Sequence, residues 1–198
     1  MKKILLSAIL LVSMISVERI QAQNSFTTLS YSMALGTGNT GDFISQYSFR
    51  GFAFDYRSMP TENGGFGLYL GWNTLYEEMP YQTYTYETLS ATGYQFRYFN
   101  SFPILAMADY YAKPGEAINP YIGLGAGVQY NVASVDFGIY RFEKDAWPFT
   151  LCPEVGTIIQ LPNGPFLNIG IKYMYGFKTG EMDADSHFLF NVGFNFGS

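Results

Sequence analysis

The C-terminal segment, from Asp185 to Ser198, alternates between two kinds of residue with a period of two. Successive side chains of a β-strand point to opposite faces, so this segment has two chemically distinct faces. The first face comprises Phe188, Phe190, Val192, Phe194 and Phe196, and the second comprises Leu189, Asn191, Gly193, Asn195 and Gly197. The second face has amides and glycines where the solvent face of a soluble sheet carries Lys and Glu. The segment is therefore not an ordinary surface strand of a soluble domain.

The same alternation recurs along the chain and is clearest at residues 120–131. There, apolar residues alternate with Gly123, Gly125 and Gly127. Three glycines on one face leave room only for the side chains of neighbouring strands, as the interior of a narrow barrel requires. The pattern predicts eight strands, over residues 26–36, 43–57, 66–73, 93–111, 120–131, 147–160, 167–177 and 187–198. A bulge at Gly51 would explain a change of phase within the second strand.

The predicted connections differ in length. We expect connections at residues 36–42, 77–92, 133–146 and 178–186 at one end of the sheet, and shorter turns near 60–64, 112–118 and 161–164 at the other. Most of 77–92, which is rich in Tyr and Thr, is expected to be an exposed loop. Short turns at one end and longer loops at the other are typical of transmembrane barrels.

The composition favours a membrane environment. Charged residues make up 14% of the chain, whereas a soluble domain has about 25%. No apolar run after the first twenty residues is long enough for a membrane-spanning helix, and without helices only a closed barrel satisfies its backbone polar groups in lipid. We therefore predict an all-β fold, an eight-stranded antiparallel up-and-down transmembrane β-barrel. The alternative is a soluble eight-stranded calycin barrel, which would place its charges outside.

The N-terminus has the features of a cleavable secretory signal peptide. Lys2 and Lys3 precede an apolar run over residues 4–15, and Ala22 is a small residue at the expected cleavage site. We expect two parts, the signal peptide over 1–22 and the barrel domain over 23–198. The full chain has a net charge of −5, and loss of Lys2 and Lys3 makes the mature chain more acidic. An acidic chain argues against a nucleic-acid partner.

Three segments carry a family resemblance: PYIGLGAGVQY at 120–130, FPILAMADYY at 102–111 and FLFNVGFNF at 188–196. With them, the whole mature chain resembles the small eight-stranded outer-membrane β-barrel family, which is OmpX/OmpA-like. The resemblance implies a monomer in the cell outer membrane, surrounded by outer-membrane lipid and inserted by the barrel-assembly machinery. It also implies a possible surface ligand, bound through the outer loops.

Charged residues on the small-residue face should lie in the lumen. We expect Arg50, Arg97, Asp109, Glu154 and Lys172 to form a luminal polar network, because charges removed from water need partners. The network would plug an eight-stranded barrel, and a proton or ion path is the alternative. The residues expected to face lipid are Trp72, Leu124, Trp147, Ile169, Tyr175, Phe190, Phe194 and Phe196.

Few residues suggest chemistry. His187, the single histidine, follows Ser186 and two acids, Asp183 and Asp185. Adjacent strand residues face opposite ways, so Ser186 and His187 should not form a hydrolytic pair, and we expect His187 to be a solvated histidine at the end of a loop. Cys152 is expected to be a small apolar filler. We expect no catalytic residue, metal or cofactor.

A cluster of tyrosines offers a possible recognition surface. Tyr81, Tyr84 and Tyr86 lie near three glutamates, Glu77, Glu78 and Glu87, and form either an exposed binding edge or part of the interfacial aromatic girdle. The resulting hypothesis is a non-enzymatic outer-membrane barrel with a filled lumen that has a structural or surface-interaction role. The alternatives are an outer-leaflet lipid-modifying enzyme and a small-solute pore.

Overall fold

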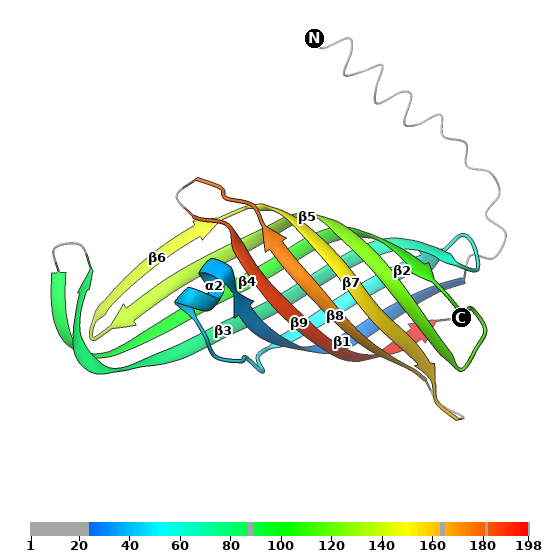
Figure 1. The fold of residues 1–198 in the computed structure, drawn as a ribbon, viewed down its shortest axis with the longest axis horizontal. Helices are drawn as coiled ribbons and strands as arrows, with labels where there is room; N and C mark the ends of the chain where they lie inside the picture. The colour runs from blue at the N-terminus through cyan, green and yellow to red at the C-terminus, as the bar shows by residue number, and fades with distance from the viewer. Residues whose placement is uncertain (1–23, 87–88, 163–164, 181, 198) are drawn as a thin grey trace, which may run out of the picture.

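A computed structural model describes residues 24–197 except 87–88, 163–164 and 181. The predicted signal peptide, residues 1–22, and Glu87 lie outside the described residues. The described part is an elongated barrel of tilted strands (Figure 1). None of its helices is long and apolar enough to cross a membrane.

The strands follow one another around the barrel as antiparallel neighbours. Their bounds, with one short helix, are β1 Asn24–Thr37, α2 Gly38–Phe43, β2 Gly51–Met59, β3 Gly64–Tyr86, β4 Leu89–Tyr111, β5 Ile118–Phe137, β6 Tyr140–Ala146, β7 Phe149–Gln160, β8 Phe166–Gly176 and β9 Asp185–Gly197. The sheet order is β4-β3-β2-β1-β9-β8-β7-β5-β6, and pairing of β4 with β5 closes a ring of eight strands. β6 pairs only with the end of β5, beyond the part that pairs with β7.

The barrel is inverted relative to a soluble protein, which confirms the predicted fold class. Leu124 is 56% exposed and Phe194 is 44% exposed, whereas Lys172 is 2% exposed and Asn191 is 4% exposed. Oily side chains therefore point away from the axis and polar ones point toward it. A soluble calycin barrel would have the opposite order.

Two segments predicted as loops are strands, so those predictions are wrong. β3 continues to Tyr86 and β4 begins at Leu89, and β5 with β6 occupies most of 133–146. These parts extend beyond the ring, where Figure 1 shows β3, β4, β5 and β6 reaching past the other strands. We call residues 77–97 and 131–146 the protruding end. These strands lack the alternation of apolar with small or polar residues that is typical of the ring. Outside the ring neither face of a strand meets lipid, so the sequence does not need that alternation.

The connection after β1 also differs from the prediction. Residues 38–43 form α2, and regular β2 begins only at Gly51, not at residue 43. Between them, Ser48 forms an isolated bridge with Ala34. The phase change at Gly51 is thus the start of a strand, and no bulge within a longer strand is needed. β4 is continuous despite Pro103, although its pairing with β3 is interrupted between Ile104 and Ser101, next to the residue that has no N–H.

Candidate functional site

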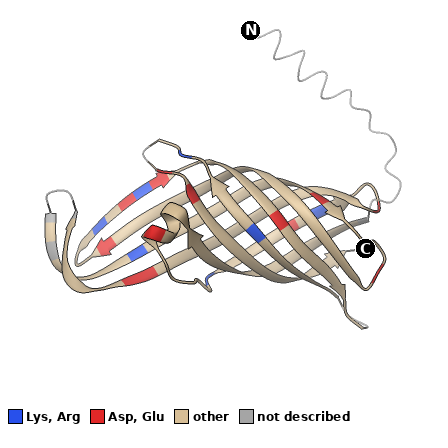
Figure 2. Ribbon diagram, in the orientation of Figure 1, with Lys and Arg blue, Asp and Glu red and all other residues tan. Residues whose placement is uncertain are grey.

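A buried ionic cluster fills one level of the lumen. Arg57 on β2 pairs with Asp55 at 2.9 Å, with Asp109 on β4, and with Glu154 on β7 at 3.5 Å. Lys172 on β8 pairs with Glu154 and lies 3.5 Å from Asp55. All five side chains are at most 8% exposed. Figure 2 shows charged residues within the barrel wall as well as along the protruding end.

Strand register and glycines bring the cluster together. Glu154 and Lys172 are direct cross-strand partners on β7 and β8. Asp55 and Arg57 lie two apart on β2, so they share the inward face. Arg57 is opposite Gly67, and Asp109 is opposite Gly65 on one side and Gly123 on the other. The missing side chains at these glycines let the guanidinium reach across β3 to the carboxylate.

Tyrosines complete the coordination of the charges. The Tyr121 hydroxyl lies 2.8 Å from Glu154 Oε1 and 3.1 Å from Asn168 Oδ1, and Lys172 Nζ lies 4.8 Å from the centroid of the Tyr69 ring. Charges removed from water are tolerated only when such partners replace their hydration. The cluster thus blocks the lumen with groups that are bound to one another.

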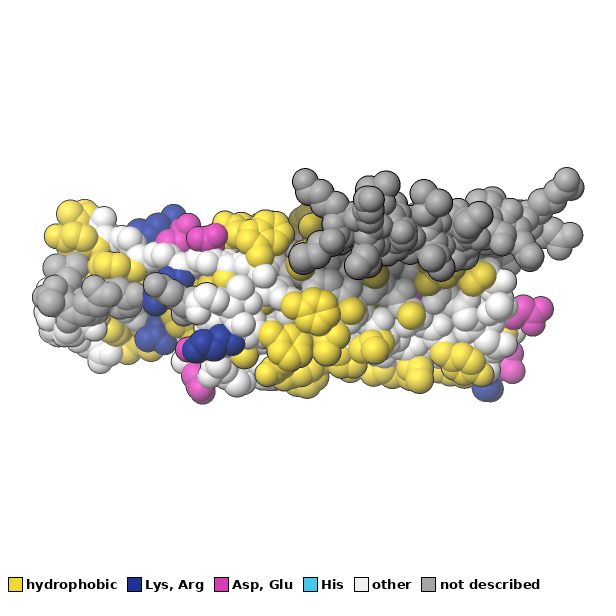
Figure 3. All heavy atoms as spheres, turned by 90° about the horizontal axis from the view of Figure 1, so that it is seen from above, with side chains coloured by type: hydrophobic (Ala, Val, Ile, Leu, Met, Phe, Trp, Pro, Cys, Tyr) yellow, Lys and Arg dark blue, Asp and Glu magenta, His cyan; other side chains and the backbone are white. Residues whose placement is uncertain are grey.

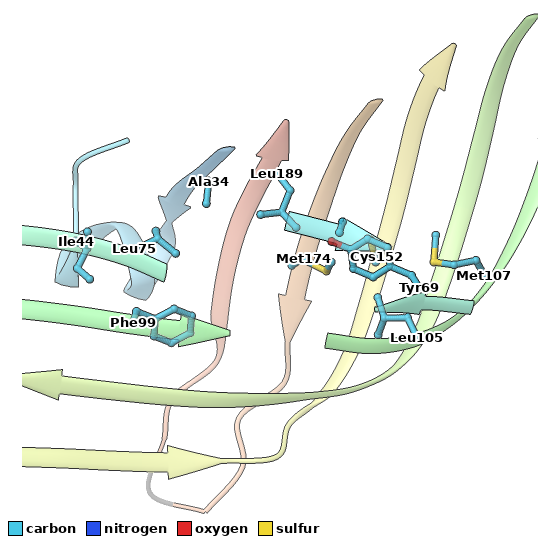
Figure 4. Packing of buried hydrophobic residues seen from close by; sticks show 11 residues of the cluster. Ala34, Ile44, Tyr69, Leu75, Phe99, Leu105, Met107, Cys152, Met174 and Leu189 are labelled. Carbon is cyan, nitrogen blue, oxygen red and sulfur yellow. The ribbon is translucent and has the colours of Figure 1, made fainter. Parts of the chain in front are cut away.

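Apolar side chains seal the lumen on the side of the protruding end. Leu105, Met107, Cys152, Met174 and Leu189 are each at most 3% exposed and pack near Tyr69, as Figure 4 shows. A second group, which comprises Ile44, Leu75 and Phe99, lies farther toward the protruding end (Figure 4). Cys152 is a free thiol with no exposed surface. An ionic level and apolar levels together occupy the lumen of the described barrel.

The predicted luminal residues fall into two groups. Asp109, Glu154 and Lys172 meet in the cluster. Arg97 instead donates hydrogen bonds to the Phe43 carbonyl and to Gln95, both at 3.0 Å, within the protruding end. Arg50 is exposed, with its guanidinium carbon 5.0 Å from the Tyr76 ring centroid. The assignment of Arg50 and Arg97 to the network is therefore corrected.

Asp55 and Arg57 belong to the cluster but were not among the predicted residues. The sequence does contain a pattern that locates them. After Gly51 the aromatic residues Phe52, Phe54 and Tyr56 occupy the even positions, which indicates that even positions face outward. The other parity, which includes Asp55 and Arg57, must then face inward.

Aromatic rings form a continuous row on the outer surface. Contacts run from Phe52 to Trp72 at 5.5 Å, to Phe102 at 6.5 Å, to Tyr130 at 6.3 Å and to Trp147 at 4.8 Å between ring centroids. This row crosses β2, β3, β4 and β5, and ends just before β7. We call these five residues the aromatic girdle. Rings at this height are typical of the boundary between lipid and water.

The residues predicted to face lipid lie on the outer surface. Six of them are exposed: Leu124, Trp147, Ile169, Tyr175, Phe194 and Phe196. Trp72 and Phe190 are partly covered by neighbouring rings, Phe52 and Phe102 in the first case and Phe188 in the second. On the face shown in Figure 3, hydrophobic side chains cover much of the middle of the barrel, and charged ones gather toward its two ends.

Solved structures share this architecture. Neisserial surface protein A (NspA) superposes with a TM-score of 0.53 at 15% sequence identity, and the match covers 88% of this chain and 97% of that one. The outer membrane protein OprG from Pseudomonas aeruginosa superposes with a TM-score of 0.50 at 13% identity, covering 89% and 97%. The chain has the fold of the small eight-stranded outer-membrane β-barrels. No family model and no curated protein matches its sequence.

His187 has no catalytic geometry. It is fully buried, and neither ring nitrogen has a hydrogen-bond partner among the described residues. Ser186 points elsewhere and donates to the Thr37 carbonyl at 3.0 Å. Asp185 accepts from Gln129 at 2.6 Å and from Asn131 at 2.8 Å. The prediction of a solvated histidine at a loop end is wrong, because β9 begins at Asp185 and carries His187 into the lumen.

The loop between β8 and β9 contains an exposed ion pair. Lys178 donates to Asp183 at 2.7 Å, and this bond lowers the pKa of Asp183 and raises the pKa of Lys178. Within the described part of the chain, no group of three or more His, Cys, Asp or Glu side chains could hold a metal ion.

Proposed function

We propose that this outer-membrane barrel is a closed scaffold that displays its protruding end for contact with other surfaces or molecules. The observation that carries the proposal is the contrast between the two parts. The lumen is occupied by the ionic cluster and apolar side chains. In contrast, β3, β4, β5 and β6 continue beyond the closed ring of eight strands. Surrounding lipid and the barrel-assembly machinery are the partners that insertion of such a barrel requires.

The outermost part of the protruding end supports a recognition role. From Met79 to Tyr86 and from Leu89 to Tyr94, β3 and β4 pair only with each other among the described strands. Tyr81 is 63% exposed and Tyr94 is 51% exposed, with ring centroids 5.4 Å apart. We call these two segments the ribbon. Hydrogen bonds between Thr83 and Thr92 and between Thr85 and Ser90 join its two strands. Exposed tyrosines on a pre-ordered strand are suited to binding, because tyrosine is enriched at interfaces.

The barrel should not conduct solutes. We expect purified full-length protein in planar lipid bilayers to give no current steps above those of the bare membrane, because side chains fill the lumen. A porin reconstituted in parallel is the positive control. Stable, reproducible channels from folded protein would contradict the closed scaffold and favour the pore alternative.

Removing the ribbon tests the display role. Met79 and Gln95 are direct partners in the ladder, so an Asn-Gly turn can replace residues 80–94 without changing the barrel. We expect cells that carry this variant to lose adhesion to plates coated with serum glycoproteins, while outer-membrane fractionation and heat-modifiable gel mobility stay unchanged. A matched control, Tyr81→Thr with Tyr84→Thr, keeps the length of the ribbon and removes two rings. Undiminished adhesion of the shortened variant would refute the display role.

A further inference from the structure

Arg50 occupies an unusual place for a cation in this chain. It lies on the outer surface at the edge of the aromatic girdle, two residues before Phe52, and its side chain is exposed. Among the described residues it forms no ion pair, since every described salt bridge involves another cation. At the protruding end, Arg97 forms two hydrogen bonds and Arg141 pairs with Asp136, and in the loop between β8 and β9 Lys178 pairs with Asp183. Arg50 is thus a cation with free donors beside the girdle.

The backbone at Arg50 is fixed on both sides. Its N–H donates to Ser48 Oγ at 3.2 Å, and its carbonyl accepts from the Thr74 N–H at 2.9 Å. Ser48 is itself held by the bridge to Ala34 and by a 2.5 Å hydrogen bond to the Thr74 carbonyl. The Tyr31 hydroxyl donates to the Phe49 carbonyl. The backbone from which the Arg50 side chain projects is therefore fixed in position.

The guanidinium of Arg50 lies over an aromatic ring. The Tyr76 ring lies 5.0 Å from the guanidinium carbon, within the range of a cation–π contact. Tyr76 in turn contacts Tyr98 at 5.0 Å between centroids. Two aromatic residues close to Arg50 in the sequence are also exposed, Phe49 at 63% and Phe52 at 56%. The site therefore presents one positive charge at the height where lipid headgroups begin and exposed rings where acyl chains lie.

We propose that Arg50 binds a phosphate group on the headgroup of an outer-leaflet lipid, with Phe49 and Phe52 against its acyl chains. A guanidinium presents parallel N–H donors that match two phosphate oxygens, and such charge-assisted bonds are strong next to a low-dielectric medium. The assignment rests on the proposed orientation, in which the short turns face the periplasm and the protruding end faces outward. It explains why this arginine lies outside the barrel and has no acidic partner.

The test measures lipid binding by purified, folded full-length protein in neutral detergent. The probes are a bisphosphorylated disaccharide lipid (lipid A), the same lipid without phosphates, and inorganic phosphate, with bound lipid counted by native mass spectrometry. We expect Arg50→Gln to weaken binding of the phosphorylated lipid about tenfold, and Arg50→Lys to give an intermediate loss because an ammonium lacks the planar fork. Arg141→Gln is the matched control and should bind like the unchanged protein.

Three results would overturn the assignment. Arg50→Gln could bind the phosphorylated lipid as tightly as the unchanged protein does. The lipid without phosphates could bind equally well, which would leave only acyl-chain contacts, or inorganic phosphate could compete at equal concentration, which would indicate a free-anion site. Residue 50 lies outside the segment removed from the shortened variant, so loss of adhesion and loss of lipid binding are separate outcomes.

Discussion

We expect Lys172→Met to lower the free energy of unfolding by about 3–5 kcal/mol, the range seen when one partner of a buried ion pair is removed. Lys172 is 2% exposed and pairs with Glu154 and Asp55. Its loss leaves three carboxylates facing Arg57 alone, with side chains that are at most 8% exposed. Methionine keeps most of the length of the side chain, so the effect reports the lost charge more than a cavity.

Urea titration in lipid vesicles, followed by tryptophan fluorescence, would measure the change. Trp72 and Trp147, the two tryptophans of the chain, both lie in the girdle and so report exit from the membrane. Lys178→Met is the matched control, since the Lys178–Asp183 pair is exposed and should matter little. Adding Glu154→Gln to Lys172→Met should recover part of the stability. Equal losses for Lys172→Met and Lys178→Met would show that the cluster does not stabilise the barrel.

We expect Gly127→Val to prevent folding, or to lower the free energy of unfolding by more than the roughly 1–3 kcal/mol that overpacking an interior usually costs. A Cβ at this position would overlap the carbonyl oxygen of Ile104 and would lie 2.9 Å from the Cα of Leu105. Both neighbours are backbone atoms of β4 and cannot move aside without breaking the ladder. The readout is heat-modifiable gel mobility after refolding into detergent or vesicles.

The adjacent residue provides the control. Ala126 has the opposite parity and faces outward between Ala106 and Leu151 on the neighbouring strands. Ala126→Val should refold like the unchanged protein, because it adds only apolar surface on the lipid side. Normal refolding of Gly127→Val would mean that the barrel interior at this height is wider than the backbone positions indicate.

The sequence by itself determined which way most strands of the ring face. Parity is a local property, so Leu124, Phe194 and Lys172 could be assigned to the correct face before any strand was placed in space. The same reasoning places Asp109 and Glu154 inside, and Gly123, Gly125 and Gly127 on the crowded face. It fails where neither face meets lipid, which is why the strands of the protruding end were predicted as loops.

Only the tertiary structure decided which inward charges meet. The odd or even position of a residue in a strand gives the side of the sheet that it faces, but not its position along the barrel axis. Arg97 therefore shares the predicted inward face with Lys172 and yet lies in the protruding end. Arg50 is outside, because the regular strand starts only at Gly51 and the preceding segment follows the edge of β3. Arg57 reaches Asp109 because stagger of the strands aligns glycines of β3 between them. Register and stagger arise from closure of the whole sheet, and no single segment contains that information.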